Sequence, residues 1–153
     1  MNWRELQTGA PDLAALAREH FERAGMALVG TLRGDGSPRI SCVYPRVLED
    51  DLLLAMMWRS RKAVDLLRDP RLVLHNAIST NRGDEVEVIL RGRAVEIGGA
   101  DSRSRYLAAV PEWGDRQFHL FAVDLEGAAV VRYRAGEQYV KVWPQGVEFQ
   151  RPY

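Results

Sequence analysis

The chain has 153 residues, 46% hydrophobic and 27% charged, and its 21 basic residues balance 21 acidic ones to a formal net charge of zero. Such a length and composition are typical of one globular domain, spanning 1–153, that buries a core without disulfides or metal ions. The zero net charge argues against non-specific nucleic-acid binding, which normally needs a basic excess, and no nucleic-acid partner is expected.

The cysteine count and the apolar segments indicate in which cellular compartment the protein is expected. Cys42 is the single cysteine, which excludes an internal disulfide or a CxxC metal site and fits a reducing compartment. Residues 1–7 contain Arg4 and Glu5 and no continuous apolar core, so no signal peptide is expected. No stretch approaches the roughly 18 apolar residues of a membrane span. We therefore expect a soluble, cytoplasmic protein without a membrane partner.

The first half is predicted to form a helix and three strands. Apolar residues recur at helical spacing over 11–24, Pro11 suits a first turn and Gly25 ends the run. A hairpin follows, because two strand-like segments flank the turn sequence Gly-Asp-Gly-Ser. The predicted segments are strands at 26–33, 38–48 and 52–58, with turns at 34–37 and 49–51.

The second half returns to helical spacing once before its strands. The segment 60–69 has helical spacing and stops at Pro70. The remaining predicted segments are a strand at 71–78, a loop at 79–84, a strand at 85–97, a helix at 100–110, an irregular stretch at 112–117, and strands at 118–125, 127–134 and 137–143.

This order predicts an α+β, mainly β fold built on antiparallel pairing. Long strands in a chain of this size must curl to avoid open edges. An antiparallel split β-barrel with flanking helices is therefore favoured over a flat sheet.

The segment Trp58-Arg59-Ser60-Arg61-Lys62-Ala63 has the most chemical information. Ser60 suits the N-cap of the helix that follows, so Arg61 and Lys62 would lie in its first turn. Cations are unfavourable there, because the free N–H groups already give a helix start a partial positive charge. A bound phosphate would reverse that sign by accepting hydrogen bonds from the N–H groups and pairing with both side chains. The alternative is a basic face that is simply solvated.

Arg39 is a second candidate for the same anion. It follows the Gly34–Ser37 turn on a strand that could lie beside the helix start, with Ser41 on the same face. The alternative for this residue is an edge-strand arginine in solvent.

Three segments together resemble a known superfamily. They read GTLRGDGSPRISCVYP, LLLAMMWRSRKAVDLLRDPRLVLH and VEVILRGRAVEI. Over roughly residues 20–143 this order resembles the pyridoxamine 5′-phosphate oxidase-like, FMN-binding split-barrel superfamily, and Ser60-Arg61-Lys62-Ala63 is similar to its phosphate-binding helix start. The resemblance implies FMN as the cofactor and a homodimer with the flavin at the interface, which Trp143 of the C-terminal region could approach.

The resemblance also implies which residues hold the flavin. The phosphate would be bound by Arg39, Ser60, Arg61 and Lys62. The isoalloxazine ring would be lined by one strand and by the end of the next: Ile40, Ser41, Cys42, Val43, Tyr44, Ala55, Met56 and Met57.

The substrate residues of true pyridoxamine-phosphate oxidases have no counterpart in ADSRSRYLAAVPEWGDRQFHL or in PQGVEFQRPY. We therefore expect an FMN-dependent oxidoreductase acting on another small redox substrate, with catalytic residues unassigned. Two alternatives stay open: a reductase that uses the deazaflavin coenzyme F-420, and a non-catalytic flavin- or haem-binding stress or storage module. A small barrel that binds single-stranded nucleic acid is disfavoured by the charge balance.

Two residue types are set aside. Cys42 lies among apolar neighbours, which predicts a buried and inert thiol. The three histidines, at 20, 75 and 119, have no ligand-like spacing, so no metal site is expected.

Overall fold

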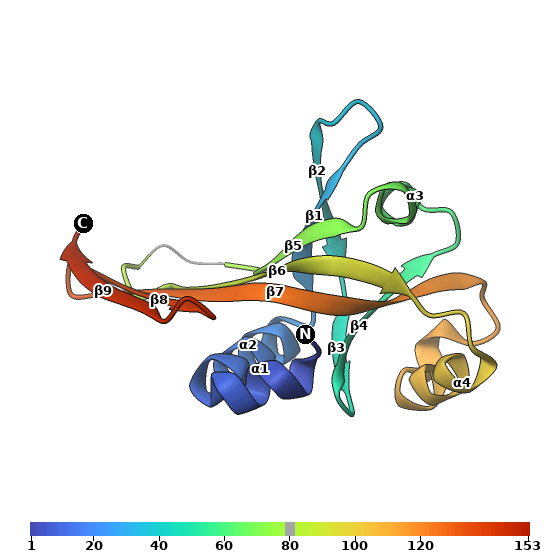
Figure 1. Cartoon of the computed structure of the whole chain (residues 1–153), viewed down its shortest axis with the longest axis horizontal. Coiled ribbons are helices and arrows are strands. Elements are labelled where there is room, and N and C mark those ends of the chain that lie inside the picture. The colour runs from blue at the N-terminus through green and yellow to red at the C-terminus, as the bar shows by residue number, and fades with distance from the viewer. Residues whose placement is uncertain (79–81) are drawn as a thin grey trace.

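The structure is a computed structural model that describes residues 1–78 and 82–153. A nine-stranded antiparallel sheet forms its centre (Figure 1). The helices are α1 (Trp3–Gly9), α2 (Pro11–Ala24), α3 (Arg61–Arg68) and α4 (Ala100–Ala109), with a short 3-10 turn η1 (Pro111–Trp113). The strands are β1 (Ala27–Leu32), β2 (Pro38–Val43), β3 (Pro45–Leu48), β4 (Asp51–Met57), β5 (Arg71–Asn76), β6 (Val86–Glu96), β7 (Phe118–Arg134), β8 (Glu137–Trp143) and β9 (Val147–Pro152).

The sheet curls because the first and last strands of its path, β2 and β3, are consecutive in the chain. The strand order is β2-β1-β5-β6-β7-β4-β3, so consecutive strands β2 and β3 stand at opposite ends of the path. Only Tyr44 separates them in the chain. Because the chain passes directly from β2 into β3, the two ends of the path meet at Tyr44, and the sheet must curl back on itself toward a barrel. Beyond the barrel, β8 pairs with the far end of β7 and β9 pairs with β8.

Local sequence signals account for the helix boundaries. Asn2 caps α1 through a reciprocal capping box with Glu5. In α2, Pro11 occupies the first turn and Gly25 ends the helix in the left-handed region at φ 68°. Figure 1 shows α1 and α2 on one side of the sheet and α3 on the other. No helix in the described ranges is long and apolar enough to cross a membrane.

The core divides into two clusters of buried apolar side chains. The larger cluster packs α1, α2 and α3 against the inner barrel face, and its fully buried members include Trp3, Leu6, Leu54 and Leu74. The smaller one joins α4 to β4 and β7 through Tyr106, Phe118 and Leu120. Gly92 allows β6 and β7 to approach closely at a register shift, where a Cβ would stand 2.3 Å from the Asp124 carbonyl oxygen.

The structure confirms the helix at 11–24 and the hairpin of β1 and β2, whose register sets Thr31 opposite Arg39. Two elements, α1 and β9, were not predicted, and two expectations were wrong: β2 and β3 were joined into one strand, and β7 was divided in two. The last two errors have one cause: strand continuity depends on partner strands far along the chain, which a local pattern does not contain. Part of the predicted loop at 79–84 lies outside the described residues.

Candidate functional site

The start of α3 has the charge pattern that the sequence predicts. Ser60 is the N-cap, Arg61 and Lys62 occupy the first turn, and that turn contains no acidic residue. The Ser60 side chain makes no capping hydrogen bond, and its Oγ is buried without any hydrogen-bond partner in the described chain. A buried unpaired hydroxyl is costly. An acceptor oxygen at this helix start would satisfy Ser60 and offset the two cations.

Lys62 ties this helix start to β2. Its Nζ donates a hydrogen bond of 2.6 Å to the Cys42 carbonyl oxygen. Burial lowers the pKa of Lys62, an effect that the nearby Cys42 side chain partly opposes. The contact brings the predicted ring-lining strand against the predicted phosphate helix, which are 20 residues apart in the chain.

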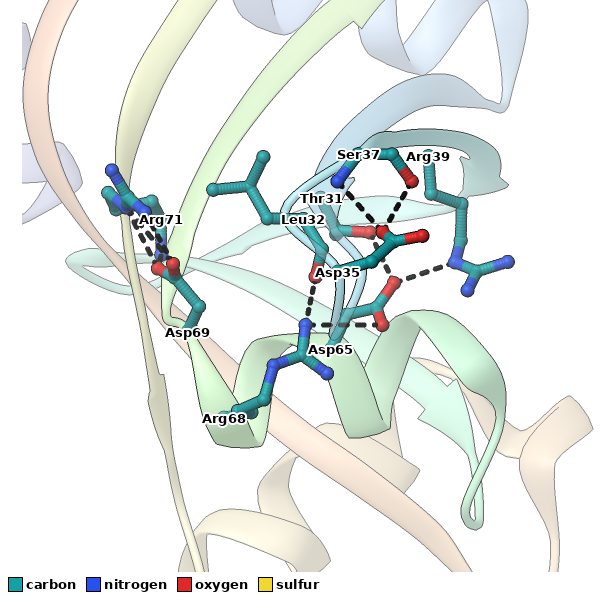
Figure 2. A network of polar contacts seen from close by, with 9 residues as sticks. All are labelled: Thr31, Leu32, Asp35, Ser37, Arg39, Asp65, Arg68, Asp69 and Arg71. Atoms are coloured by element: carbon teal, nitrogen blue, oxygen red, sulfur yellow. Dashed lines mark hydrogen bonds and ion pairs between the residues drawn. The ribbon is translucent and has the colours of Figure 1, made fainter.

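Arg39 is held by a buried carboxylate. Its Nε donates to Asp65 Oδ2 at 2.6 Å, and Thr31 Oγ1 donates to the same oxygen at 2.9 Å. The side chain of Asp65 is only 5% exposed. Figure 2 shows the terminal nitrogens of Arg39 pointing away from Asp65. Because Asp65 lies one helical turn after Arg61, this contact holds the guanidinium within a turn of the helix start and leaves its terminal nitrogens for a ligand.

Asp65 is the residue of this candidate site that was not predicted from the sequence. Burial alone would raise the pKa of its carboxyl, but hydrogen bonds from Arg39 and Thr31, with the charges of Arg39 and Arg68, lower it overall. The carboxylate therefore stays ionised and completes a network joining β1, β2 and α3 (Figure 2). A charged residue on the buried face of an amphipathic helix was the one available signal.

The predicted ring-lining residues fall into two sets. Ile40 and Met57 are strongly exposed, at 72% and 65%, whereas Val43, Ala55 and Met56 are buried. Ser41 is half-buried, and Tyr44 is 53% exposed. The buried side chains belong to the core, so only their backbone remains for a surface ligand. Among the described strands, β3 pairs with β4 only as far as Leu54, which leaves one backbone edge of the following residues open.

The expectation for Cys42 was wrong. The thiol is exposed rather than buried. The burial pattern of β2 alternates along the strand, and Ile40 and Cys42 lie on its exposed face. Alternation along β2 turns Arg39 and Val43 inward instead.

A cavity of about 860 Å³ lies elsewhere in the described chain. It is lined by α2, the end of β5, the start of β6, the far end of β7 and Tyr139 of β8. None of the predicted site residues lines it. Its three arginines and three carboxylates, Arg23, Arg132, Arg134, Glu19, Asp84 and Glu85, cancel in charge. We place the candidate site at α3, because unpaired polar atoms and uncompensated cations distinguish a ligand site better than volume does.

Solved structures confirm the fold. The chain is similar to a NimC/NimA family protein from Clostridium acetobutylicum (14% identity, 90% of this chain and 97% of that chain, TM-score 0.67). It is also similar to a putative pyridoxamine 5′-phosphate oxidase from Listeria innocua (13%, 74% and 94%, TM-score 0.61). A third is the haem storage protein HutZ from Vibrio cholerae (14%, 74% and 90%, TM-score 0.58). No family model and no curated protein matches by sequence.

These likenesses define the class of fold, which is the split barrel of pyridoxamine 5′-phosphate oxidase-like proteins, as the sequence predicts. Proteins with this fold include both a putative oxidase and haem-binding proteins. The residues at α3 fit a phosphorylated cofactor on this chain's own geometry. Ser60 has a buried unpaired hydroxyl, Arg61 and Lys62 stand at the helix start, and Arg39 is fixed nearby.

Proposed function

We propose that this protein is an oxidoreductase that binds FMN by its phosphate at the start of α3. The observation that carries the proposal is the buried, unpaired Ser60 hydroxyl beneath the two first-turn cations Arg61 and Lys62. A phosphate monoester supplies the acceptor oxygens and the negative charge that this helix start lacks. Arg39, fixed by Asp65, would contribute the third cation.

In this proposal the chain binds and orients, and the flavin when bound supplies the hydride or electron chemistry. The outward residues Ile40 and Met57 would contact the ring, together with the open backbone edge at the end of β4. A small redox substrate would stack over the remaining face of the ring. No described residue is assigned as a catalytic acid or base.

We further propose a homodimer with the cofactor at the seam between subunits. Exposed apolar side chains occur on β2, on the end of β4 and on α3: Ile40, Met57, Val64 and Leu67. Large exposed apolar areas next to a charged site are typical of subunit interfaces. Light scattering of the purified protein tests this. A dimer that dissociates in an Ile40→Glu/Leu67→Glu variant is expected, and a monomeric wild type contradicts it.

Titration with FMN tests the phosphate site. An Arg61→Ala/Lys62→Ala variant should bind FMN about a hundredfold more weakly, because two charge-assisted hydrogen bonds are lost. The matched control is Arg132→Ala/Arg134→Ala, which removes two cations from the 860 Å³ cavity. If Arg61→Ala/Lys62→Ala bound FMN as tightly as the wild type and the control variant bound it more weakly, the FMN site would lie in that cavity instead.

A second candidate function is non-catalytic storage of flavin or haem, because two of the similar structures are described as a haem-binding protein and a haem storage protein. Turnover with a nicotinamide donor and an electron acceptor separates the two. The same titration with the deazaflavin coenzyme F-420, followed by mass measurement of any co-purified ligand, identifies the cofactor.

A further inference from the structure

Trp58 forms a flat aromatic stack just before the helix start. Its ring lies 4.3 Å from the ring of His119, centroid to centroid, with an angle of 8° between the planes. His119 is 4% exposed, whereas Trp58 is 52% exposed. One face of the indole is therefore covered by the histidine, and about half of the Trp58 surface stays exposed to solvent.

A carboxylate holds the His119 ring in place. His119 lies on β7 opposite Met56, and its Nδ1 donates to Glu96 Oε1 at 2.6 Å. A carboxylate can only accept, so Nδ1 carries the hydrogen. The Nε2 atom is buried and has no partner in the described chain. Burying a polar ring with an unpaired nitrogen costs free energy, and packing against a surface tryptophan alone would not require it.

The stack is one tight turn from the phosphate site. Trp58 directly follows the last residue of β4, and its backbone N–H donates to the Gln117 carbonyl oxygen. Arg59 then turns the chain through the left-handed region, at φ 53°, into Ser60. Met57, 65% exposed, precedes it. Only Arg59 separates the indole from the helix start at Ser60, and a ligand with a phosphate at one end and a planar ring at the other would meet both.

We infer that Trp58 is a stacking platform for the planar ring of the bound ligand, and that His119 and Glu96 are positioning residues that hold the indole flat. This inference rests on the proposed function. The polarised face of a tryptophan ring favours offset stacking with electron-poor heterocycles, and the rigid support reduces the entropy lost on binding. The cradle at Ser60 would then select the phosphate, and Trp58 would select the ring.

Binding of three probes separates the two parts: FMN, riboflavin, which lacks the phosphate, and inorganic phosphate. A Trp58→Leu variant is expected to bind both FMN and riboflavin about tenfold more weakly, with unchanged affinity for phosphate. Trp58→Phe should restore most of the affinity. Trp113→Leu is the matched control, since Trp113 packs against Phe118 in the smaller core cluster.

The outcomes are distinct. If the wild type binds FMN and Trp58→Leu binds it equally well, the platform is overturned while the phosphate site stands. If the wild type binds neither FMN nor riboflavin, the proposed function fails and the platform fails with it. Thermal unfolding of each variant confirms that the fold is retained.

The role of His119 is tested with two variants, one that keeps an aromatic ring at this position and one that removes it. His119→Leu should weaken riboflavin binding and reduce the quenching of tryptophan emission by FMN, whereas His119→Phe should keep both, because it preserves the stack. Phosphate affinity should stay unchanged in both variants. Equal riboflavin binding by the two variants would overturn the positioning role.

Discussion

At its C-terminal end, α3 carries Arg68 in the last turn, where the negative end of the helix dipole attracts a cation, and Asp69 then pairs with Arg71 in solvent. At the other end the arrangement is reversed. Arg61 and Lys62 stand at the positive end, Ser60 is unpaired, and a buried carboxylate holds a third cation nearby. Figure 2 shows both the buried Asp65 network and the separate Asp69–Arg71 pair. Only the N-terminal end has charges that its own helix cannot compensate, and this is the difference on which the proposed phosphate site rests.

Removing Asp65 should have the largest effect on stability. Asp65→Ala is expected to lower the free energy of unfolding by about 3 kcal/mol, since it leaves the mostly buried Arg39 without its partner. Urea denaturation measures the change. The paired control is Asp69→Ala at the exposed end, and equal losses in the two variants would contradict the contrast between the two ends.

The pH dependence of stability should reflect the same carboxylate. Because the folded-state pKa of Asp65 is lowered from 3.8, the unfolded chain binds its proton first as the pH falls. Its contribution to stability is therefore complete above the unfolded-state pKa and disappears as the pH falls through the folded-state pKa. The stability difference between the wild type and Asp65→Asn should be constant at neutral pH and narrow below about pH 4. A difference that widens in acid would refute this assignment.

Reversing one charge at the helix start should separate stability from binding. Arg61→Glu is expected to stabilise the ligand-free protein by about 0.5 kcal/mol, since an anion suits the positive end of the helix. The same variant should lose measurable FMN binding. Thermal unfolding without ligand and an FMN titration give the two readings, and a destabilised ligand-free variant would show that Arg61 has a structural role.

The smallest effect is expected at the exposed pair. Hydrogen bonds from Arg71 lower the pKa of Asp69 to about 2, yet both groups are in contact with water, which screens their attraction. Arg71→Ala should therefore leave both the unfolding midpoint and FMN affinity unchanged within error. A clear loss of FMN affinity would extend the binding site along α3.

Signals that act within a few residues were sufficient for much of the fold. The Gly-containing turn after β1 predicted the hairpin, Pro11 and Gly25 predicted the limits of α2, and Pro70 predicted the end of α3. The cations of the first turn of α3 were also visible, because helix polarity is a local property. The short strand β9 is exposed along its whole length and has only two large apolar residues, Val147 and Phe149, so its pattern is too short to reveal a strand.

The sequence by itself determined most of the helices and strands, the antiparallel fold class and the unfavourable cations at one helix start. Only the tertiary structure decided that Tyr44 separates the two ends of the sheet path, that Arg39 reaches Asp65, and that Trp58 stacks on His119. The physical reason is the range of the interactions. Turns and caps are fixed by neighbours in the chain, whereas register, curvature and buried pairs depend on contacts between segments brought together by folding.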